Sequence, residues 1–240
     1  MAEVDSRVEA QDESPERAEP REAEAWKARD LKARILRFIV KRRSRLPGWH
    51  QQALGVLAAA EADGVRVLEA ALPAIGDAKL RRIFLKHIED EKRHTAGFTA
   101  LARKYGVPIP AHVSQPISTN VLEFFGFLEI TELRGEQMIK TYRGLYGKYP
   151  EVQAFMDTVI RDERYHASYL HAQLETWAGQ GLAKEVAAAR KAAYRIDSSG
   201  FRAQLLAFLG TVPRLLAHEI RSLPATLFRR SGDSAVSAPK

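Results

Sequence analysis

The sequence contains no cysteine among its 240 residues. Disulfides, thiolate metal sites, iron–sulfur clusters and a cysteine nucleophile are therefore excluded. Aromatic residues are also scarce, at 8% of the chain, and the abundance of Ala, Leu, Glu, Lys and Arg favours helices over sheets. The chain has no apolar N-terminal signal region and no apolar run of the roughly 20 residues that a membrane-spanning helix needs. We therefore expect an all-α protein in the cytoplasm.

Charge is distributed unevenly along the chain. Residues 1–25 carry a net charge of −6, and because the whole chain carries +7, the remainder carries +13. The acidic opening segment has very few side chains that could be buried, and a segment of this kind does not fold by itself. We expect residues 1–25 and residues 231–240 to be disordered tails.

Helical signals dominate between these tails. Glycine and proline divide this part of the chain into helical stretches, and residues 106–116 contain three prolines, so they are expected to form an extended connector. The four central helices are predicted at residues 49–72, 77–105, 118–147 and 150–178. Further helical segments are predicted at residues 183–195 and 201–228. The chain therefore divides into a basic amphipathic helix (26–48), a four-helix bundle with one long crossover (49–180) and a helical extension (181–230).

One short motif occurs twice in nearly the same form. The chain reads IEDEKRH from position 88 and IRDERYH from position 160. Residues three apart share one face of a helix, so Glu91 lies beside His94, and Glu163 beside His166. Two such pairs that face each other would bring two carboxylates and two imidazoles to one point.

Each copy of the motif has a matching segment upstream. Glu61 precedes Glu91 by 30 residues, and Glu132 precedes Glu163 by 31 residues. A glycine follows each upstream glutamate at the same distance. Glu61 also lies in an otherwise apolar stretch, where a buried carboxylate needs a cationic partner. Four carboxylates and two histidines suit two first-row metal ions in a bundle core.

At these residues the sequence resembles the ferritin-like superfamily, over roughly residues 50–178, and the stretch IFLKHIEDEKRHTAGF is most similar to rubrerythrins. The resemblance implies a ferritin-like bundle with a dinuclear site of iron, or of manganese or a mixed pair. The implied ligands are Glu61 and His94 for one metal, Glu132 and His166 for the other, and Glu91 and Glu163 as bridges. The resemblance also implies that Asp90 and Asp162 each form a hydrogen bond with the histidine of the opposite motif.

Other polar residues lie near this set. Glu129 and Glu136 share the helix face of Glu132. Glu129 is a candidate extra ligand because rubrerythrins have an additional glutamate near this place, whereas Glu136 is expected to pair with Lys140. His87 is interpreted as a supporting or structural residue rather than as a ligand.

The function implied by the resemblance is activation of O2 or peroxide, as in rubrerythrins and ferritins, with electrons from an external donor because the cysteine-bearing domain of typical rubrerythrins is absent. One alternative is a membrane-surface hydroxylase that resembles demethoxyubiquinone hydroxylase. Another is a non-catalytic metal-binding protein. Whether the chain is an enzyme therefore stays open at this point.

The two basic flanks, residues 26–45 and 201–230, combine Lys and Arg with apolar residues. Each would suit an anionic membrane surface, for example the inner face of the membrane, to which the protein would bind peripherally. The alternatives are packing on the bundle or on a second copy of the chain in a homodimer. Nucleic-acid binding is not expected, because no recognition motif or aromatic platform accompanies the charge.

Overall fold

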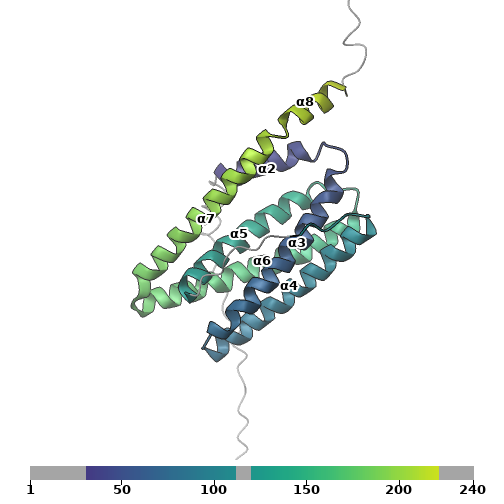
Figure 1. Cartoon of the computed structure of the whole chain (residues 1–240). Coiled ribbons are helices and arrows are strands. Elements are labelled where there is room, and N and C mark those ends of the chain that lie inside the picture. Colours follow the sequence, from purple (N-terminus) through teal and green to yellow (C-terminus); the bar gives the residue numbers. More distant parts are fainter. Residues whose placement is uncertain (1–30, 112–119, 222–240) are drawn as a thin grey trace, which may run out of the picture.

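A computed structural model describes residues 31–111 and 120–221 (Figure 1). Within these ranges the chain forms helices and connecting turns, without strands. The expected tails at residues 1–25 and 231–240 lie outside the described residues. The helices are α2 (Leu31–Arg43), α3 (Trp49–Ala71), α4 (Ala78–Lys104), α5 (Val121–Arg143), α6 (Pro150–Trp177), α7 (Ala183–Leu209) and α8 (Val212–Arg221), with a short 3-10 turn, η1 (Leu72–Ala74), after α3 and a π-helical turn, η2 (Ala178–Leu182), after α6.

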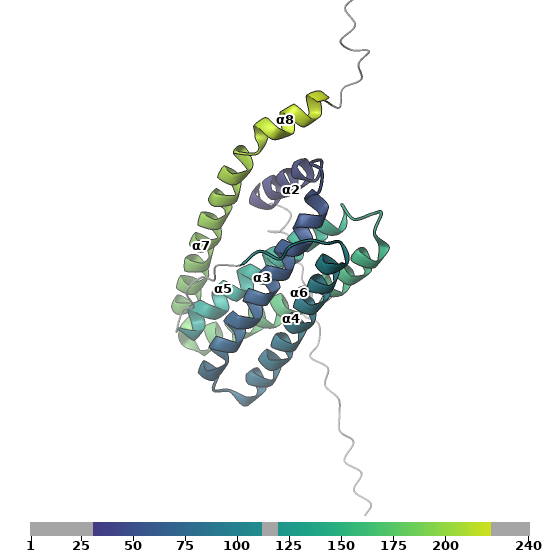
Figure 2. The ribbon, with the colours of Figure 1, turned by 45° about the vertical axis from the view of Figure 1, so that its right-hand side comes forward.

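Helices α3 to α6 form two packed pairs, α3 with α4 and α5 with α6, and the pairs lie together in a helical bundle (Figures 1 and 2). Local capping explains where the helices begin. The Asp77 side chain accepts a hydrogen bond from the Leu80 amide at the start of α4, and Pro150 occupies the first turn of α6. Helix α5 begins later than the predicted residue 118, because Asn120 caps it by accepting from the amides of Leu122 and Glu123.

The apolar core consists of two layers with a polar zone between them. Along α4, for example, Phe84 and Ile88 belong to one layer and Phe98 belongs to the other. Along α6 the order is reversed, because that helix runs in the opposite direction. The glutamate and histidine of each repeated motif lie between the two layers. Their side chains are therefore enclosed by hydrocarbon at both ends, which removes most of the water that would otherwise hydrate them.

Helix α7 differs from the prediction of two segments at residues 183–195 and 201–228, because it is one helix that packs along α5. The hydroxyl of Ser198 donates to the Tyr194 carbonyl and that of Ser199 to the Ile196 carbonyl, so these side chains bond within the helix and do not end it. The break comes at Gly210, just before Pro213 in the first turn of α8.

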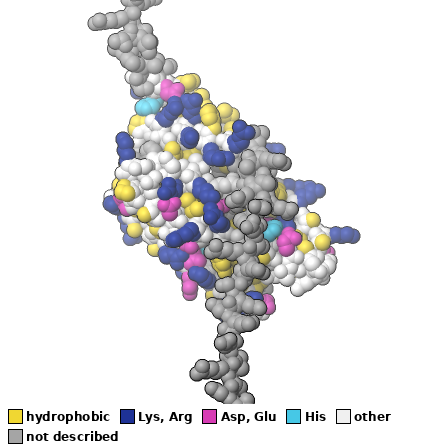
Figure 3. Space-filling model, turned by 180° about the vertical axis from the view of Figure 1, so that it is seen from behind, with side chains coloured by type: hydrophobic (Ala, Val, Ile, Leu, Met, Phe, Trp, Pro, Cys, Tyr) yellow, Lys and Arg dark blue, Asp and Glu magenta, His cyan; other side chains and the backbone are white. Residues whose placement is uncertain are grey.

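Helix α2, the first helix of the described residues, packs against the end of this extension through a small apolar cluster that includes Ile39, Phe208 and Leu215. Lys and Arg side chains are spread over the face of the molecule in Figure 3, with hydrophobic side chains between them. Among the described helices, none has an apolar stretch long and continuous enough to cross a lipid bilayer.

Candidate metal centre

The polar zone of the bundle contains two groups of side chains, each of which could hold a metal ion. All four bundle helices contribute. Helix α3 provides Glu61 and α5 provides Glu132, whereas α4 and α6 each provide a glutamate and a histidine of the repeated motif. In each group the candidate ligand atoms lie within 4.8 Å of one another. The repeated pattern therefore brings all six of the expected ligand residues to one place.

The first group contains Glu61, Glu91, His94 and Glu163. Nδ1 of His94 lies 3.6 Å from a carboxylate oxygen of each of the three glutamates. His94 is fully buried, and 5% or less of Glu91 and Glu163 is exposed. This group therefore offers three carboxylates and one imidazole.

The second group contains His87, Glu91, Glu132 and His166. Nδ1 of His166 lies 3.5 Å from Oε1 of Glu91 and 3.7 Å from Oε2 of Glu132. Nε2 of His87 lies 3.5 Å from the same oxygen of Glu91 and 3.6 Å from Oε1 of Glu132. Glu91 belongs to both groups, as expected for a bridge, whereas Glu163 belongs only to the first. His87 takes a place in the second group that the sequence interpretation did not give it.

The inward-facing atoms of these residues fit a bound cation. Oε1 of Glu91, Nδ1 of His94 and His166, and Nε2 of His87 are buried and accept or donate no hydrogen bond. Buried polar atoms without a partner are costly, and a metal ion would satisfy all four atoms. Ligand atoms about 2.1 Å from one ion lie roughly 3.0–3.4 Å apart, so a small contraction from the observed separations would bring them into contact with an ion.

The outer nitrogen of each motif histidine faces an aspartate from the opposite motif. Nε2 of His94 lies 3.2 Å from Asp162, and Nε2 of His166 lies 3.4 Å from Asp90. Arg93 donates to both aspartates, at 2.7 and 2.8 Å. An aspartate that accepts from Nε2–H leaves Nδ1 free to bind a metal, which fixes the tautomer that a ligand histidine needs.

Burial and close contacts shift the pKa values of the first group in different directions. Burial, followed by the charge of Glu91, raises the pKa of Glu61 to about 8. Burial alone would also raise the pKa of Glu91, but its close contacts with His87 and His94 outweigh burial, and the pKa falls well below the ordinary value. Burial would lower the pKa of His94, but Glu61 and Glu91 raise it to about 11.

The pKa values of Glu163 and Glu132 are also shifted in opposite directions. Burial and the neighbouring charge of Glu132 raise the pKa of Glu163 well above the ordinary value. The pKa of Glu132 is lowered, because the contacts with His87 and His166 outweigh the effect of burial. Metal ions would replace the protons that Glu61 and Glu163 retain.

Two glycines make room for the carboxylates. A Cβ at Gly64 on α3 would lie 3.5 Å from Oε2 of Glu91, and a Cβ at Gly135 on α5 would lie 3.1 Å from Oε2 of Glu163. These are the glycines that follow Glu61 and Glu132 in the repeat. A glycine at each position lets the helix backbone come close to a carboxylate from the neighbouring helix.

The two other acidic residues on the face of Glu132 lie outside both groups. Glu129 is buried, but it accepts hydrogen bonds from Arg190 on α7 at 2.8 and 2.9 Å and lies 2.7 Å from Nδ1 of His171. These contacts satisfy the carboxylate that the resemblance implied as an extra ligand. Glu136 pairs with Lys140 at 2.9 Å, as predicted, and also with Arg164 at 3.0 Å.

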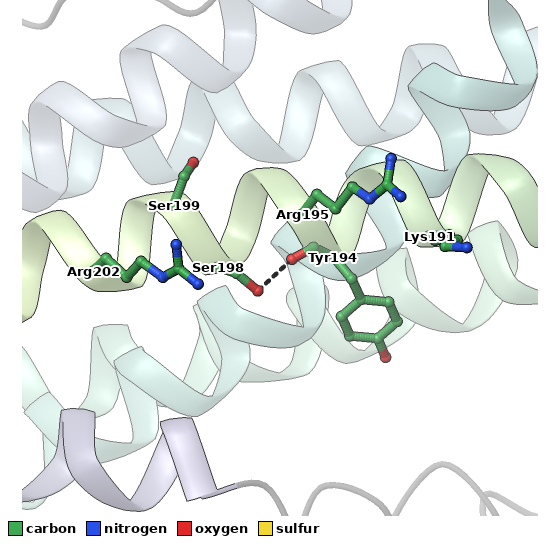
Figure 4. Close-up of a pocket in the computed structure, with 6 residues that line it drawn as sticks. All are labelled: Lys191, Tyr194, Arg195, Ser198, Ser199 and Arg202. Atoms are coloured by element: carbon green, nitrogen blue, oxygen red, sulfur yellow. Dashed lines mark hydrogen bonds between the residues drawn. The ribbon is translucent and has the colours of Figure 1, made fainter.

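Figure 4 shows a surface groove on α7. It shares no residue with the two buried groups. Its lining residues are Lys191, Tyr194, Arg195, Ser198, Ser199 and Arg202. The candidate metal ligands therefore lie in the bundle core and not in this open groove.

Comparison with known proteins adds no family assignment. The chain matches no protein-family model, no curated protein and no solved structure.

Proposed function

We propose that this chain is a ferritin-like dinuclear metal protein that activates O2 or peroxide. The observation that supports the proposal is the pair of buried ligand groups that share Glu91. Each helix pair contributes one glutamate and one Glu-x-x-His motif, which is the ligand arrangement of ferritin-like di-iron proteins. Iron is the proposed metal, with manganese or a mixed pair as alternatives, because carboxylate and imidazole ligands suit both.

Bound iron would supply Lewis-acid and one-electron redox chemistry. The residues of the chain have other roles in the proposed activity. The two apolar layers exclude water from the centre, and Asp90 and Asp162 hold the motif histidines in the tautomer that presents Nδ1 inward. The proposed source of electrons is a separate reductant, because the sequence has no cysteine to hold the thiolate-bound iron centre of typical rubrerythrins.

Anaerobic loading with Fe²⁺ tests the proposal most directly. After desalting, about two iron ions per chain are expected by mass spectrometry. The double substitution Glu91→Ala with Glu163→Ala should reduce the count to near zero, because it removes a ligand from both groups. Two ions retained by this variant would contradict the ligand assignment.

Catalysis is tested separately from binding. The iron-loaded protein should consume O2 or peroxide faster than free Fe²⁺ at the same concentration, and the loaded Glu129→Gln variant should behave like wild type because Glu129 lies outside both groups. Stoichiometric iron binding without consumption would favour a non-catalytic metal-binding protein.

A membrane-surface hydroxylase is the second candidate, and one observation favours it. Leu206, Leu209 and Leu216 are between 53% and 69% exposed on α7 and α8. Arg202 and Arg214 are also exposed on these helices. Exposed leucines beside arginines suit an anionic lipid surface.

Vesicles separate the second candidate from the first. The chain should sediment with vesicles rich in phosphatidylserine, and substitution of the three exposed leucines by glutamine should abolish this association. These side chains are exposed, so the replacement should leave the fold intact. A chain that stays in the supernatant would remove the support for a membrane-surface hydroxylase.

A further inference from the structure

The internal repeat is broken beside the metal centre. Alignment of Glu91 with Glu163 places His87 opposite Val159, and it places Tyr169 opposite Gly97. All six expected ligands therefore have a counterpart of the same type, but His87 does not. An otherwise symmetric centre carries one additional imidazole on one side only.

The contacts of His87 would suit a metal ligand. Its side chain is fully buried, and its Nε2 faces Glu91 and Glu132 without a hydrogen bond. Its ring stacks on the ring of His166, with the centroids 3.6 Å apart. The two histidines therefore present their inward nitrogens side by side to the same pair of carboxylates.

A partner on α6 fixes the outer nitrogen of His87. Nδ1 of His87 lies 2.8 Å from the hydroxyl of Tyr169. If Nδ1 carries the proton and donates it to the hydroxyl oxygen, then Nε2 keeps its lone pair for a metal. Tyr169 thus has the role for His87 that Asp90 has for His166.

The opposite side of the centre has no such pair. Val159 is fully buried in the apolar layer there. Gly97 has no side chain, and the ring of Phe155 fills the place where its Cβ would be. A polar His–Tyr pair on one side thus corresponds to apolar packing on the other.

We propose that His87 is a ligand of one metal only, so that the two metal positions are chemically different and fill in order. This inference rests on the proposed dinuclear site. The position beside His166 would have two imidazoles and two carboxylates, and the position beside His94 one imidazole and three carboxylates. Imidazole suits Fe²⁺, Ni²⁺ and Zn²⁺, between which Co²⁺ lies in the affinity order, whereas carboxylates suit Mn²⁺. The nitrogen-rich position therefore binds a borderline ion such as Co²⁺ first, and the carboxylate-rich position binds the second ion more weakly.

Co²⁺ is a suitable probe, because it replaces Fe²⁺ without reacting with O2 and shifts the NMR signals of its ligands. After one equivalent, the wild-type chain should show two strongly shifted imidazole N–H signals, from Nδ1 of His87 and Nε2 of His166. A single shifted signal, as His94 alone would give, would overturn the proposal. This measurement uses the unaltered chain, so it does not depend on whether a variant folds.

Calorimetry of the same titration gives the second readout. Wild type should bind two Co²⁺ ions in two steps. The double variant His87→Val with Tyr169→Phe replaces the polar pair by apolar side chains, and it should weaken the tighter step at least about tenfold. His171→Gln replaces a histidine outside both groups and is the matched control, with both steps unchanged. If the double variant keeps both affinities and only loses thermal stability, then His87 is a structural residue and the proposal fails. Binding of no Co²⁺ by wild type would instead contradict the dinuclear site itself.

Discussion

Gly135 of α5 lies so close to Glu163 of α6 that a Cβ at this position would come within 3.1 Å of the carboxylate oxygen Oε2. At Gly64, the matching position in the repeat, the corresponding distance to Glu91 is 3.5 Å, an ordinary van der Waals contact. The two glycines occupy equivalent places in the sequence but leave different amounts of space.

Gly135→Ala and Gly64→Ala are therefore expected to differ. Each replaces a glycine inside a helix, which by itself adds about 1 kcal/mol of stability. At Gly64 this gain should appear as a higher melting temperature with unchanged metal binding. At Gly135 the methyl group must displace the buried carboxylate, so the affinity for Co²⁺ should fall, roughly tenfold. Calorimetric titration and thermal unfolding of both variants measure the difference, and equal metal affinities would contradict it.

Glu91 and Glu61 should affect different numbers of ions. Glu91 belongs to both ligand groups, whereas Glu61 belongs only to the first. Glu91→Ala should therefore weaken the binding of both ions, and Glu61→Ala should leave about one tightly bound ion per chain. Metal counting by mass spectrometry after desalting distinguishes the two variants. One ion retained by Glu91→Ala and none by Glu61→Ala would reverse the assignment of the shared carboxylate.

The hydroxyl of Tyr169 should matter for metal binding although it is not a ligand. It lies 2.8 Å from Nδ1 of His87, and in the proposed arrangement it accepts the Nδ1 proton, which leaves Nε2 for the metal. Tyr169→Phe should weaken one of the two Co²⁺ steps by about 10-fold. Tyr165→Phe removes a hydroxyl from a half-exposed ring one turn away and serves as the control. If Tyr169→Phe leaves the titration as unchanged as Tyr165→Phe does, then Tyr169 has no role in positioning His87.

The sequence predicted the centre of this structure better than its surroundings. Glu-x-x-His spacing depends only on helix geometry, and the apolar neighbours of Glu61 indicate burial, so the four helices and the six candidate ligands follow from local pattern. The pairing of Asp90 and Asp162 with the opposite histidines came from the family resemblance. None of these inferences required knowledge of how each helix is rotated about its own axis relative to its neighbours.

His87 could not be assigned in the same way. Its position four residues before Glu91 placed it on the correct face, but its role depends on how α4 and α6 are rotated toward each other. That rotation stacks its ring on His166 and brings Tyr169, 82 residues away in the chain, into hydrogen-bonding distance. The missing counterpart at Val159 was a usable signal in the repeat.

Glu129 shows a second limit of sequence pattern. Its place on the face of Glu132 suggested a metal ligand, but the carboxylate turns to Arg190, which lies on the extension 61 residues later. The partner depends on α7 packing along α5. Arg190 lies inside the predicted helical segment 183–195, but the sequence pattern did not indicate that this segment packs along α5, so the contact could not be foreseen.

The contact of Glu129 with Arg190 leads to a prediction about stability at acidic pH. Burial by itself would raise the pKa of Glu129, but hydrogen bonds from His171 and Arg190 outweigh it, and the pKa is lowered. A lowered pKa means that the ionised carboxylate stabilises the folded state above its unfolded pKa of about 4.3 and loses this contribution as the pH falls through the folded value. Glu129→Gln should therefore cost about 2 kcal/mol at pH 7, and the difference from wild type should shrink in acid.

Urea unfolding of the metal-free chain at pH 7 and at pH 3 measures this difference, and comparison with Glu89→Gln provides the control because Glu89 is exposed on α4. Other acids titrate in wild type and variant alike, so their contributions cancel in the comparison. A deficit for Glu129→Gln that is as large at pH 3 as at pH 7 would mean that the side chain acts through packing rather than through its charge. Because Glu129 lies outside both ligand groups, its variant should still bind about two metal ions. The acid-dependent deficit with full metal binding is therefore the result that identifies the ionised Glu129 as one of the contacts that join α7 to the bundle.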